Sequence, residues 1–223
     1  MVVLSEYLFT YPGAVAYWKL DETEGYIAHD SVADCNGTLI GDPAWQPAGG
    51  MVDGSLEFDG IDDYISTDYV LNPEEGAFSA FAWIKGGASE QVIISQTDGI
   101  DGTGNTWLGL GATSGNLMTA LVPPPVGRFI TQPMVSEAVV TDDQWHYIGF
   151  VWDGSYRSLY VDGIEVARDA NPITLAPLKS TTGGLYIGAG KNLEARTFFS
   201  GLIDDVRIYN IALNAEKIAA LSQ

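Results

Sequence analysis

The sequence contains only one cysteine and two histidines among its 223 residues. A single cysteine, Cys35, excludes a disulfide within the chain, and we expect it to fill a buried or half-buried position. A reactive thiol would need a neighbouring base, and no motif places His29 or His146 near Cys35. The sequence also lacks a Gly-x-Ser-x-Gly elbow and a glycine-rich loop followed by a phosphate-binding lysine. These absences argue against nucleophilic hydrolases and nucleotide enzymes.

Basic residues and long apolar runs are also scarce. Lys and Arg number 10 against 29 Asp and Glu, which gives a formal net charge of −19 at pH 7. A field of this sign repels phosphate backbones and anionic lipid surfaces, so nucleic acid is not expected as a partner. No apolar run reaches the length of a membrane-spanning helix, and Met1 to Tyr11 lacks the basic and apolar regions of a signal peptide. Membrane insertion is therefore not expected.

Apolar residues are plentiful and follow a period of two. Hydrophobic residues make up 46% of the chain, enough for a two-layer core. Gly, Asp and Asn interrupt the alternating segments at intervals of roughly ten residues, which is typical of a many-stranded antiparallel sandwich. We predict an all-β fold of two antiparallel sheets. No internal linker is evident, so residues 1–223 are expected to form one domain, with residues 1–13 as a candidate extension.

Individual segments predict particular elements. Phe78–Ile84 is apolar or small at both alternating sets of positions, which is typical of a central strand covered on both faces. Asp162-Gly163 fits a two-residue type I′ turn between two strands. Asn214 is a suitable cap for a short C-terminal helix. Further strands are expected at Tyr17–Leu20, Leu56–Asp59, Trp145–Trp152, Arg157–Val161, Ile164–Ala167, Leu185–Ile187 and Leu202–Tyr209. Exposed loops are expected at Gln96–Thr106 and at Pro123–Pro125.

Four stretches together resemble the laminin-G-like jelly-roll family, a branch of the concanavalin-A-like sandwiches. They are Ala16–Glu22 with the following Asp30-Ser31 and Asn36–Leu39, then Gly54–Ile65, Asp143–Gly163 and Phe199–Asn210. They occur in the family's order and cover nearly the whole chain. The resemblance implies a secreted or cell-surface location within a larger multidomain protein. It also implies a carbohydrate- or protein-binding module, often with structural calcium.

Acidic residues from both ends of the sequence form the best candidate metal site. The resemblance to related jelly rolls pairs Asp21 with Asp204 or Asp205 around a calcium ion. Calcium takes six to eight oxygen ligands, and the loop that contains Asp30 and Asn36 could supply further ones. Strand alternation would put Asp204 and Asp205 on opposite faces, so only one should face the ion, and the family resemblance favours Asp204. The alternative is that both aspartates only bind Arg207 or backbone amides at a strand end.

A second acidic cluster invites a catalytic interpretation. Retaining glucanases of the concanavalin-A-like class carry a Glu-x-Asp-x-Glu or Glu-x-Asp-x-x-Glu run on one strand, and Glu57-x-Asp59-x-x-Asp62 nearly matches it. Retaining hydrolysis needs two carboxyl groups about 5 Å apart on one rigid face. Gly60 to Asp63 resembles a turn, which would remove Asp62 from that face. We therefore predict no catalytic residues and a turn stabilised by aspartate side chains.

Carbohydrate recognition combines an aromatic surface with amide or carboxylate groups. The candidate ligand-binding residues in segments expected to be loops are Trp45, Asp98, Asp101, Asn105 and Trp107. We predict a non-catalytic recognition module that binds a glycan or a cell-surface protein. Two alternatives remain open: a protein-adhesion or architectural domain without a sugar site, and a polysaccharide hydrolase or lyase that uses the Glu57 cluster.

Overall fold

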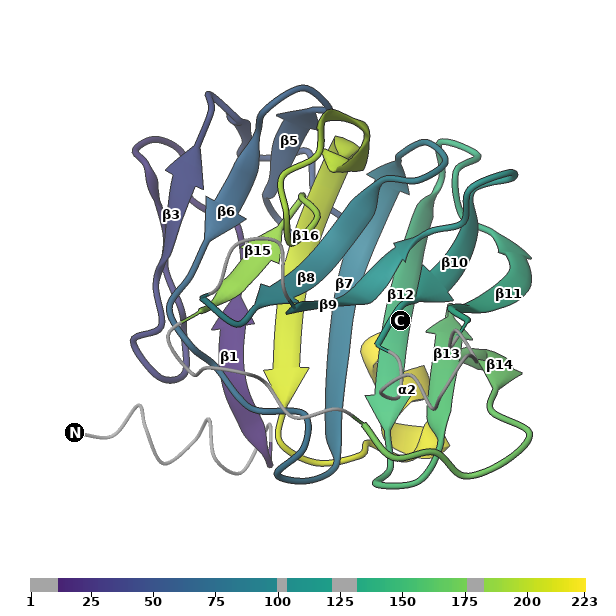
Figure 1. Ribbon diagram of the computed structural model, residues 1–223. Coiled ribbons are helices and arrows are strands. Elements are labelled where there is room, and N and C mark those ends of the chain that lie inside the picture. Colours follow the sequence, from purple (N-terminus) through teal and green to yellow (C-terminus); the bar gives the residue numbers. More distant parts are fainter. Residues whose placement is uncertain (1–11, 100–103, 122–131, 176–182) are drawn as a thin grey trace.

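Two antiparallel sheets lie face to face in this computed structural model, which describes residues 12–99, 104–121, 132–175 and 183–223 (Figure 1). Sheet A has the strand order β14 (Ile164–Arg168), β13 (Arg157–Val161), β12 (Trp145–Trp152), β7 (Phe78–Gly86), β16 (Ser200–Tyr209), β5 (Ser55–Asp59) and β4 (Ala44–Gln46), and β1 (Ala14–Trp18) also pairs with β16. Sheet B has the order β11 (Met134–Val139), β10 (Asn116–Thr119), β9 (Gly104–Leu110), β8 (Val92–Thr97), β15 (Leu185–Ile187), β6 (Tyr64–Ser66), β3 (Gly37–Ile40) and β2 (Ile27–Ala28). The predicted two-sheet antiparallel sandwich is confirmed.

The main hydrophobic core lies between the two sheets. Sheet A contributes Ala82, Ile84, Ile148 and Phe150, and sheet B contributes Ile65, Ile94, Leu108 and Ile187. All eight are fully buried. Each large aliphatic side chain in such a position stabilises the fold by about 1.5–3 kcal/mol. The alternation seen in the sequence is therefore the pattern of this interface.

Strand β7 has apolar residues on both faces because both faces of sheet A are covered. It lies between β12 and β16, and its residues from Phe78 to Ile84 are buried. On the side away from sheet B, a second hydrophobic cluster contains Phe81, Trp83, Tyr147, Val151, Tyr160, Tyr209, Leu213 and Ile218. Ile218 comes from α2 (Ala215–Leu221), which follows the predicted cap residue Asn214. The central strand and the C-terminal helix are both confirmed.

The β13–β14 hairpin also forms as predicted. Val161 pairs with Ile164, and the two residues between them, Asp162 and Gly163, both have positive φ, at 50° and 80°. Positive φ at both central positions defines the type I′ turn. The described residues contain no helix long and apolar enough to cross a membrane.

The loop predicted from Gln96 to Thr106 is shorter than expected. β8 continues to Thr97 and β9 begins at Gly104, because main-chain pairing overrides the turn-rich composition at both ends. Residues 100–103 and the predicted Pro123–Pro125 connection lie outside the described residues.

A β-bulge interrupts β16 at the point where two other strands meet. Between the pairs Asp204–Trp83 and Arg207–Phe81, β16 contains one residue more than β7. On its other edge, β16 pairs with β5 before the bulge and with β1 after it. Asp205 has φ of 53°, and the bulge inserts an extra residue into the ladder. The strict alternation predicted for this strand is therefore wrong here: two consecutive aspartates separate the core residues Ile203 and Val206.

Candidate functional site

The β16 bulge, the segment after β1 and the loop before β5 meet around Asp21 and Asp204. The Oδ1 of Asp21 accepts a hydrogen bond of 2.8 Å from Gly54 N–H, and the Oδ2 of Asp204 accepts one of 2.9 Å from Val52 N–H. A Cβ on Gly50 would lie 1.9 Å from Gly54 O and 2.9 Å from Asp204 Oδ2. Only glycine fits at Gly50, so the loop passes close to both carboxylates.

Asp204 is an incompletely satisfied acid. Its side chain is fully buried, and its Oδ1 has no hydrogen-bond partner among the described residues. Burial, together with the negative charges of Asp205 and Asp21, raises the pKa of Asp204 to about 7, although the Val52 and Met51 backbone hydrogen bonds oppose this. A buried carboxylate oxygen without a partner is costly. A cation between Asp204 and Asp21 would supply the missing interaction.

Asp205 has different partners from its neighbour. Its carboxylate accepts hydrogen bonds from the Tyr17 hydroxyl and from Arg207 Nη2, the latter at 2.6 Å. The Arg207 guanidinium also lies over the Tyr17 ring, 4.5 Å from its centroid. Burial raises the pKa of Asp205, and Arg207 opposes this shift. Asp205 thus binds Arg207 and Tyr17, as the alternative interpretation of the sequence expected for Arg207.

Asp30 and Asn36 organise their own loop. The two carboxylate oxygens of Asp30 accept backbone hydrogen bonds from Tyr17, Val32, Ala33 and Cys35, at 2.8–3.0 Å. Asn36 Oδ1 accepts the backbone N–H of Asp30 at 2.8 Å. The structure therefore brings Asp21 and Asp204 together around the Gly50–Gly54 loop, while Asp30 and Asn36 tie the 30–36 loop to β1.

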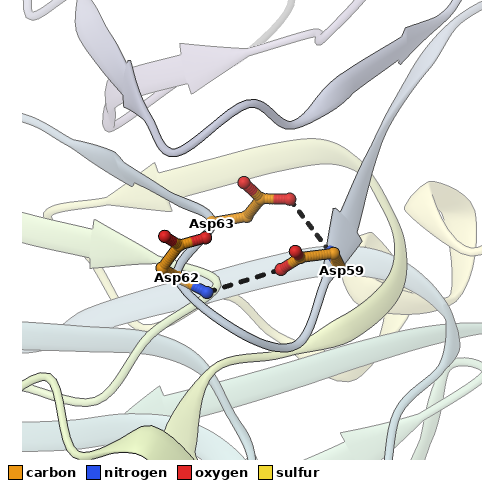
Figure 2. Close-up of side chains that lie close together, drawn as sticks. All are labelled: Asp59, Asp62 and Asp63. Atoms are coloured by element: carbon orange, nitrogen blue, oxygen red, sulfur yellow. Dashed lines mark hydrogen bonds between the residues drawn. The ribbon is translucent and has the colours of Figure 1, made fainter.

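The second acidic cluster forms a turn (Figure 2). Asp59 Oδ1 accepts hydrogen bonds from Ile61 N–H at 2.7 Å and Asp62 N–H at 3.4 Å. Asp63 is 4% exposed, and its two oxygens accept Asp59 N–H at 3.0 Å and Asp42 N–H at 2.8 Å. Burial raises the pKa of Asp63 despite these bonds. The carboxylates of Asp59, Asp62 and Asp63 lie within 4.8 Å of one another, and the predicted turn with aspartate-to-backbone bonds is confirmed.

The predicted ligand-binding residues do not form one surface. Trp107 lies in β9 with its side chain fully buried in the main core, so its assignment to an exposed loop is wrong: the β8–β9 pairing carries it inside. Asp98 is 2% exposed, and Asn105 is half-buried in β9. Trp45 is half-buried in β4 of the other sheet, where its Nε1 donates to Gly25 O at 2.9 Å. Asp101 lies outside the described residues.

The loop that Asp204 contacts was not predicted from the sequence. Residues 30–37 were expected to complete the site around Asp21 and Asp204, whereas the backbone donors to these two side chains are Gly54 and Val52. The glycines at positions 49, 50 and 54 were the available signal, because clustered glycines mark close backbone approaches.

A family model described as the concanavalin A-like lectin/glucanases superfamily matches residues 59–219. The chain belongs to this superfamily. The resemblance stated from four stretches of the sequence is confirmed, and the stretches Asp143–Gly163 and Phe199–Asn210 lie within the matched residues. No curated protein sequence matches this chain.

Solved structures share the fold of this superfamily member at low sequence identity. Domain 4 of AbnA, a GH43 extracellular arabinanase from Geobacillus stearothermophilus, in complex with arabinotriose, is 17% identical with a TM-score of 0.68, over 94% of this chain and 98% of that chain. The binding domain of Paraclostridial Mosquitocidal Protein 1 is 14% identical with a TM-score of 0.67, over 94% and 52%. A mutant of Trypanosoma rangeli sialidase is 17% identical with a TM-score of 0.62, over 94% and 32%. The chain thus spans about half the length of the mosquitocidal protein's binding domain and about a third of the length of the sialidase.

Proposed function

We propose that this chain is a non-catalytic, extracellular carbohydrate-binding module of a larger protein, stabilised by a structural calcium ion. The observation that supports the binding role is the match to domain 4 of AbnA. The match covers 98% of that domain, whose structure is a complex with arabinotriose. Because a shared fold does not specify a ligand, the identity of the glycan needs experiment. The two partial matches, to longer chains, support a role as one module among several.

The acidic turn supports a binding role over a catalytic one. A retaining glycosidase needs one carboxylate free to attack and a second free to exchange a proton. Both oxygens of Asp63 and one oxygen of Asp59 accept backbone N–H groups. Glu57 is exposed on β5, and its Oε2 accepts a 2.6 Å hydrogen bond from Gln46. These carboxylates stabilise the turn and the strand edge.

The calcium part of the proposal is supported by the donor set around Asp204. Calcium prefers carboxylate and carbonyl oxygens, and Asp204 Oδ1 is a buried carboxylate oxygen with no hydrogen-bond partner in the described part of the chain. Asp21 and Asp204 would hold the ion, and its charge would offset the desolvation of Asp204. The Gly50–Gly54 loop already binds both side chains, so the ion would link the segment after β1, the loop before β5 and the β16 bulge.

The binding role can be tested by presenting the chain to a panel of plant, microbial and host glycans, with excess calcium and with chelator. Binding of at least one glycan supports the proposal. The absence of any binder would favour a protein-adhesion or architectural domain. Release of products from a panel of polysaccharides would instead favour a hydrolase or lyase.

The calcium site can be tested by thermal melting with excess calcium and with chelator. A ligand that binds only the folded state adds about 2.7 kcal/mol of stability at a hundredfold excess over its dissociation constant. We expect a higher melting temperature in calcium than in chelator, with magnesium as the control for ionic strength. Equal melting temperatures would remove calcium from the proposal.

A further inference from the structure

Two hollows adjoin at the end of the sandwich where β12 ends and β7 begins, the lower end in Figure 1. The first has a volume of about 250 Å³ and is lined by Leu71, Asn72, Glu75, Gly76, Ala77, Phe78 and Asn210. The second has a volume of about 220 Å³ and is lined by Pro73, Glu74, Gly76, Trp152, Gly154, Ile173, Thr174 and Leu175. Gly76 lines both. The volume of each hollow alone is below the range of ~300–1,000 Å³ that is typical of small-molecule sites, and their combined volume lies within this range.

The floors of the two hollows belong to neighbouring strands. Phe78 lines the first hollow and Trp152 lines the second, and these two residues lie directly opposite each other in the β7–β12 ladder. Residues opposite each other in an antiparallel pair are about 5 Å apart. Both side chains belong to the main core, with 1% and 4% exposure. The hollows are therefore side by side on a rigid base.

Hydrogen bonds fix the loop between the two hollows, residues 71–77. Asn72 stabilises it by accepting Glu74 N–H with its Oδ1 at 3.1 Å and Glu75 N–H with its carbonyl at 3.0 Å. The fully buried Gln96 donates from Nε2 to Leu71 O at 2.6 Å. On the far wall of the second hollow, Ile173 N–H donates to Ser155 O at 2.8 Å. A site with such fixed walls loses little conformational freedom when a ligand binds.

The chemistry of the lining disfavours an anionic ligand and suits hydroxyl groups. Asn72, Asn210, Thr174, Glu74 and Glu75 supply amide, hydroxyl and carboxylate groups to the two linings. Among the described lining residues, two are glutamates and none is Lys, Arg or His. With a chain net charge of −19, these glutamates repel a carboxylate or sulfate on the ligand.

We propose that the two hollows form the carbohydrate-binding site, and that they take two adjacent units of an uncharged oligosaccharide, one on each side of Gly76. This assignment rests on the proposed binding function. It predicts that a ligand engages both hollows at once and that anionic sugars are excluded.

Gly76 provides a variant that blocks both hollows without strain. A Cβ at this position meets no heavy atom within 4 Å, and its φ is not in the left-handed region. Because Gly76 lines both hollows, Gly76→Trp adds a large side chain beside both of them, and its Cβ requires no shift of the described residues. The matched control is Ile61→Trp, because Ile61 is 69% exposed and lies in the Asp59–Asp63 turn after β5, away from both hollows.

The experiment measures binding by calorimetry with arabinotriose, cellotriose, xylotriose, maltotriose and mannotriose as neutral probes, and with 3′-sialyllactose and trigalacturonate as anionic probes. We expect wild type and Ile61→Trp to bind a neutral trisaccharide equally well. Gly76→Trp should raise the dissociation constant by about tenfold or more, because the indole occupies ligand space. Its melting temperature should match that of wild type.

The outcomes separate the site from the function. Undiminished binding by Gly76→Trp would overturn the site and leave the binding function standing. No binding of any probe by wild type would overturn both. Binding of an anionic probe as tightly as the best neutral one would overturn the assigned ligand class.

Discussion

Asp204 Oδ2 accepts a hydrogen bond of 2.9 Å from the backbone N–H of Val52, 152 residues earlier in the chain. This bond ties the β16 bulge to the loop before β5, while the buried Oδ1 of Asp204 has no partner among the residues that the structure describes. The Oδ2 atom of Asp204 therefore has a structural role, and its Oδ1 atom is available to a cation. A substitution that keeps the hydrogen bond from Val52 and removes the negative charge tests the calcium site.

Asp204→Asn should abolish the increase in melting temperature that calcium produces. The amide oxygen of Asn can still accept Val52 N–H, but the side chain no longer carries the negative charge that binds calcium. In chelator, the melting temperature of the variant should equal or exceed that of wild type, because a buried charge has been removed. Asp62→Asn, an exposed position in the acidic turn, is the control and should retain the full shift. A calcium shift that survives in Asp204→Asn would exclude Asp204 as a ligand.

Asp30→Ala should destabilise the protein without removing the calcium shift. The substitution deletes the acceptor for four backbone N–H groups, and each buried donor left unpaired costs about 1–3 kcal/mol. We expect the free energy of unfolding to fall by at least about 3 kcal/mol in urea titrations, against less than about 0.5 kcal/mol for Ser31→Ala at the neighbouring exposed position. If Asp30→Ala kept its stability but lost the calcium shift, Asp30 would be a ligand and not a loop anchor.

His146 should make stability depend on pH. Its Nδ1 lies 2.9 Å from Asp162 and its Nε2 lies 3.1 Å from Asp142. Burial lowers the pKa of His146, but the hydrogen bonds and charges of Asp162 and Asp142 outweigh it and raise the pKa above its ordinary value. The folded state therefore binds the proton more tightly than the unfolded state. This stabilisation is complete below the unfolded pKa of about 6.5 and is lost as the pH rises through the folded pKa.

The difference in unfolding free energy between wild type and His146→Gln isolates this contribution from the other charges. It should be largest near pH 5.5 and should shrink toward pH 8.5, on the scale set by the ordinary histidine pKa of about 6.5. An NMR titration of His146 in Asp162→Asn should show a lower pKa than in wild type. A difference that stayed constant across this pH range would contradict the proposed ion pairs.

Cys35 should react slowly with alkylating reagents in the folded protein. Burial, followed by the negative charges of Asp30 and Asp68, raises the pKa of the Cys35 thiol, and only the thiolate is nucleophilic. Iodoacetamide at pH 8 should modify native Cys35 more slowly than it modifies the urea-unfolded chain. Asp68→Asn should increase the native rate, because Asp68 contributes through its charge. Equal rates in native and unfolded protein would show that the thiol is freely accessible.

Much of the fold was predictable because it depends on short-range signals. The two apolar faces of Phe78–Ile84, the Asp162-Gly163 turn and the Asn214 cap each contain their information within a few residues. Pairing between neighbouring residues and local backbone geometry enforce these elements wherever the rest of the chain lies. The acidic turn from Asp59 to Asp63 belongs to the same class, since the hydrogen bonds between its own residues span at most four positions.

The site residues depend on contacts that the sequence does not display. Whether Trp107 faces the core depends on its pairing in β9, and composition alone suggested a loop. The relation between Asp204 and Asp205 depends on one extra residue in β16 relative to β7. A bulge changes which side chains share a face, and neither strand's sequence reveals it alone.

The sequence by itself determined the class of fold and the family, and the resemblance proposed Asp21 together with Asp204 or Asp205. Only the tertiary structure decided that Asp21 and Asp204 contact the Gly50–Gly54 loop and that Asp30 and Asp205 have other partners. It alone also placed Phe78 and Trp152 opposite each other beneath two adjoining hollows. The physical reason is that the Val52–Asp204 and Phe78–Trp152 relations join segments far apart in the sequence, and long-range pairing fixes them only when the sheets have formed.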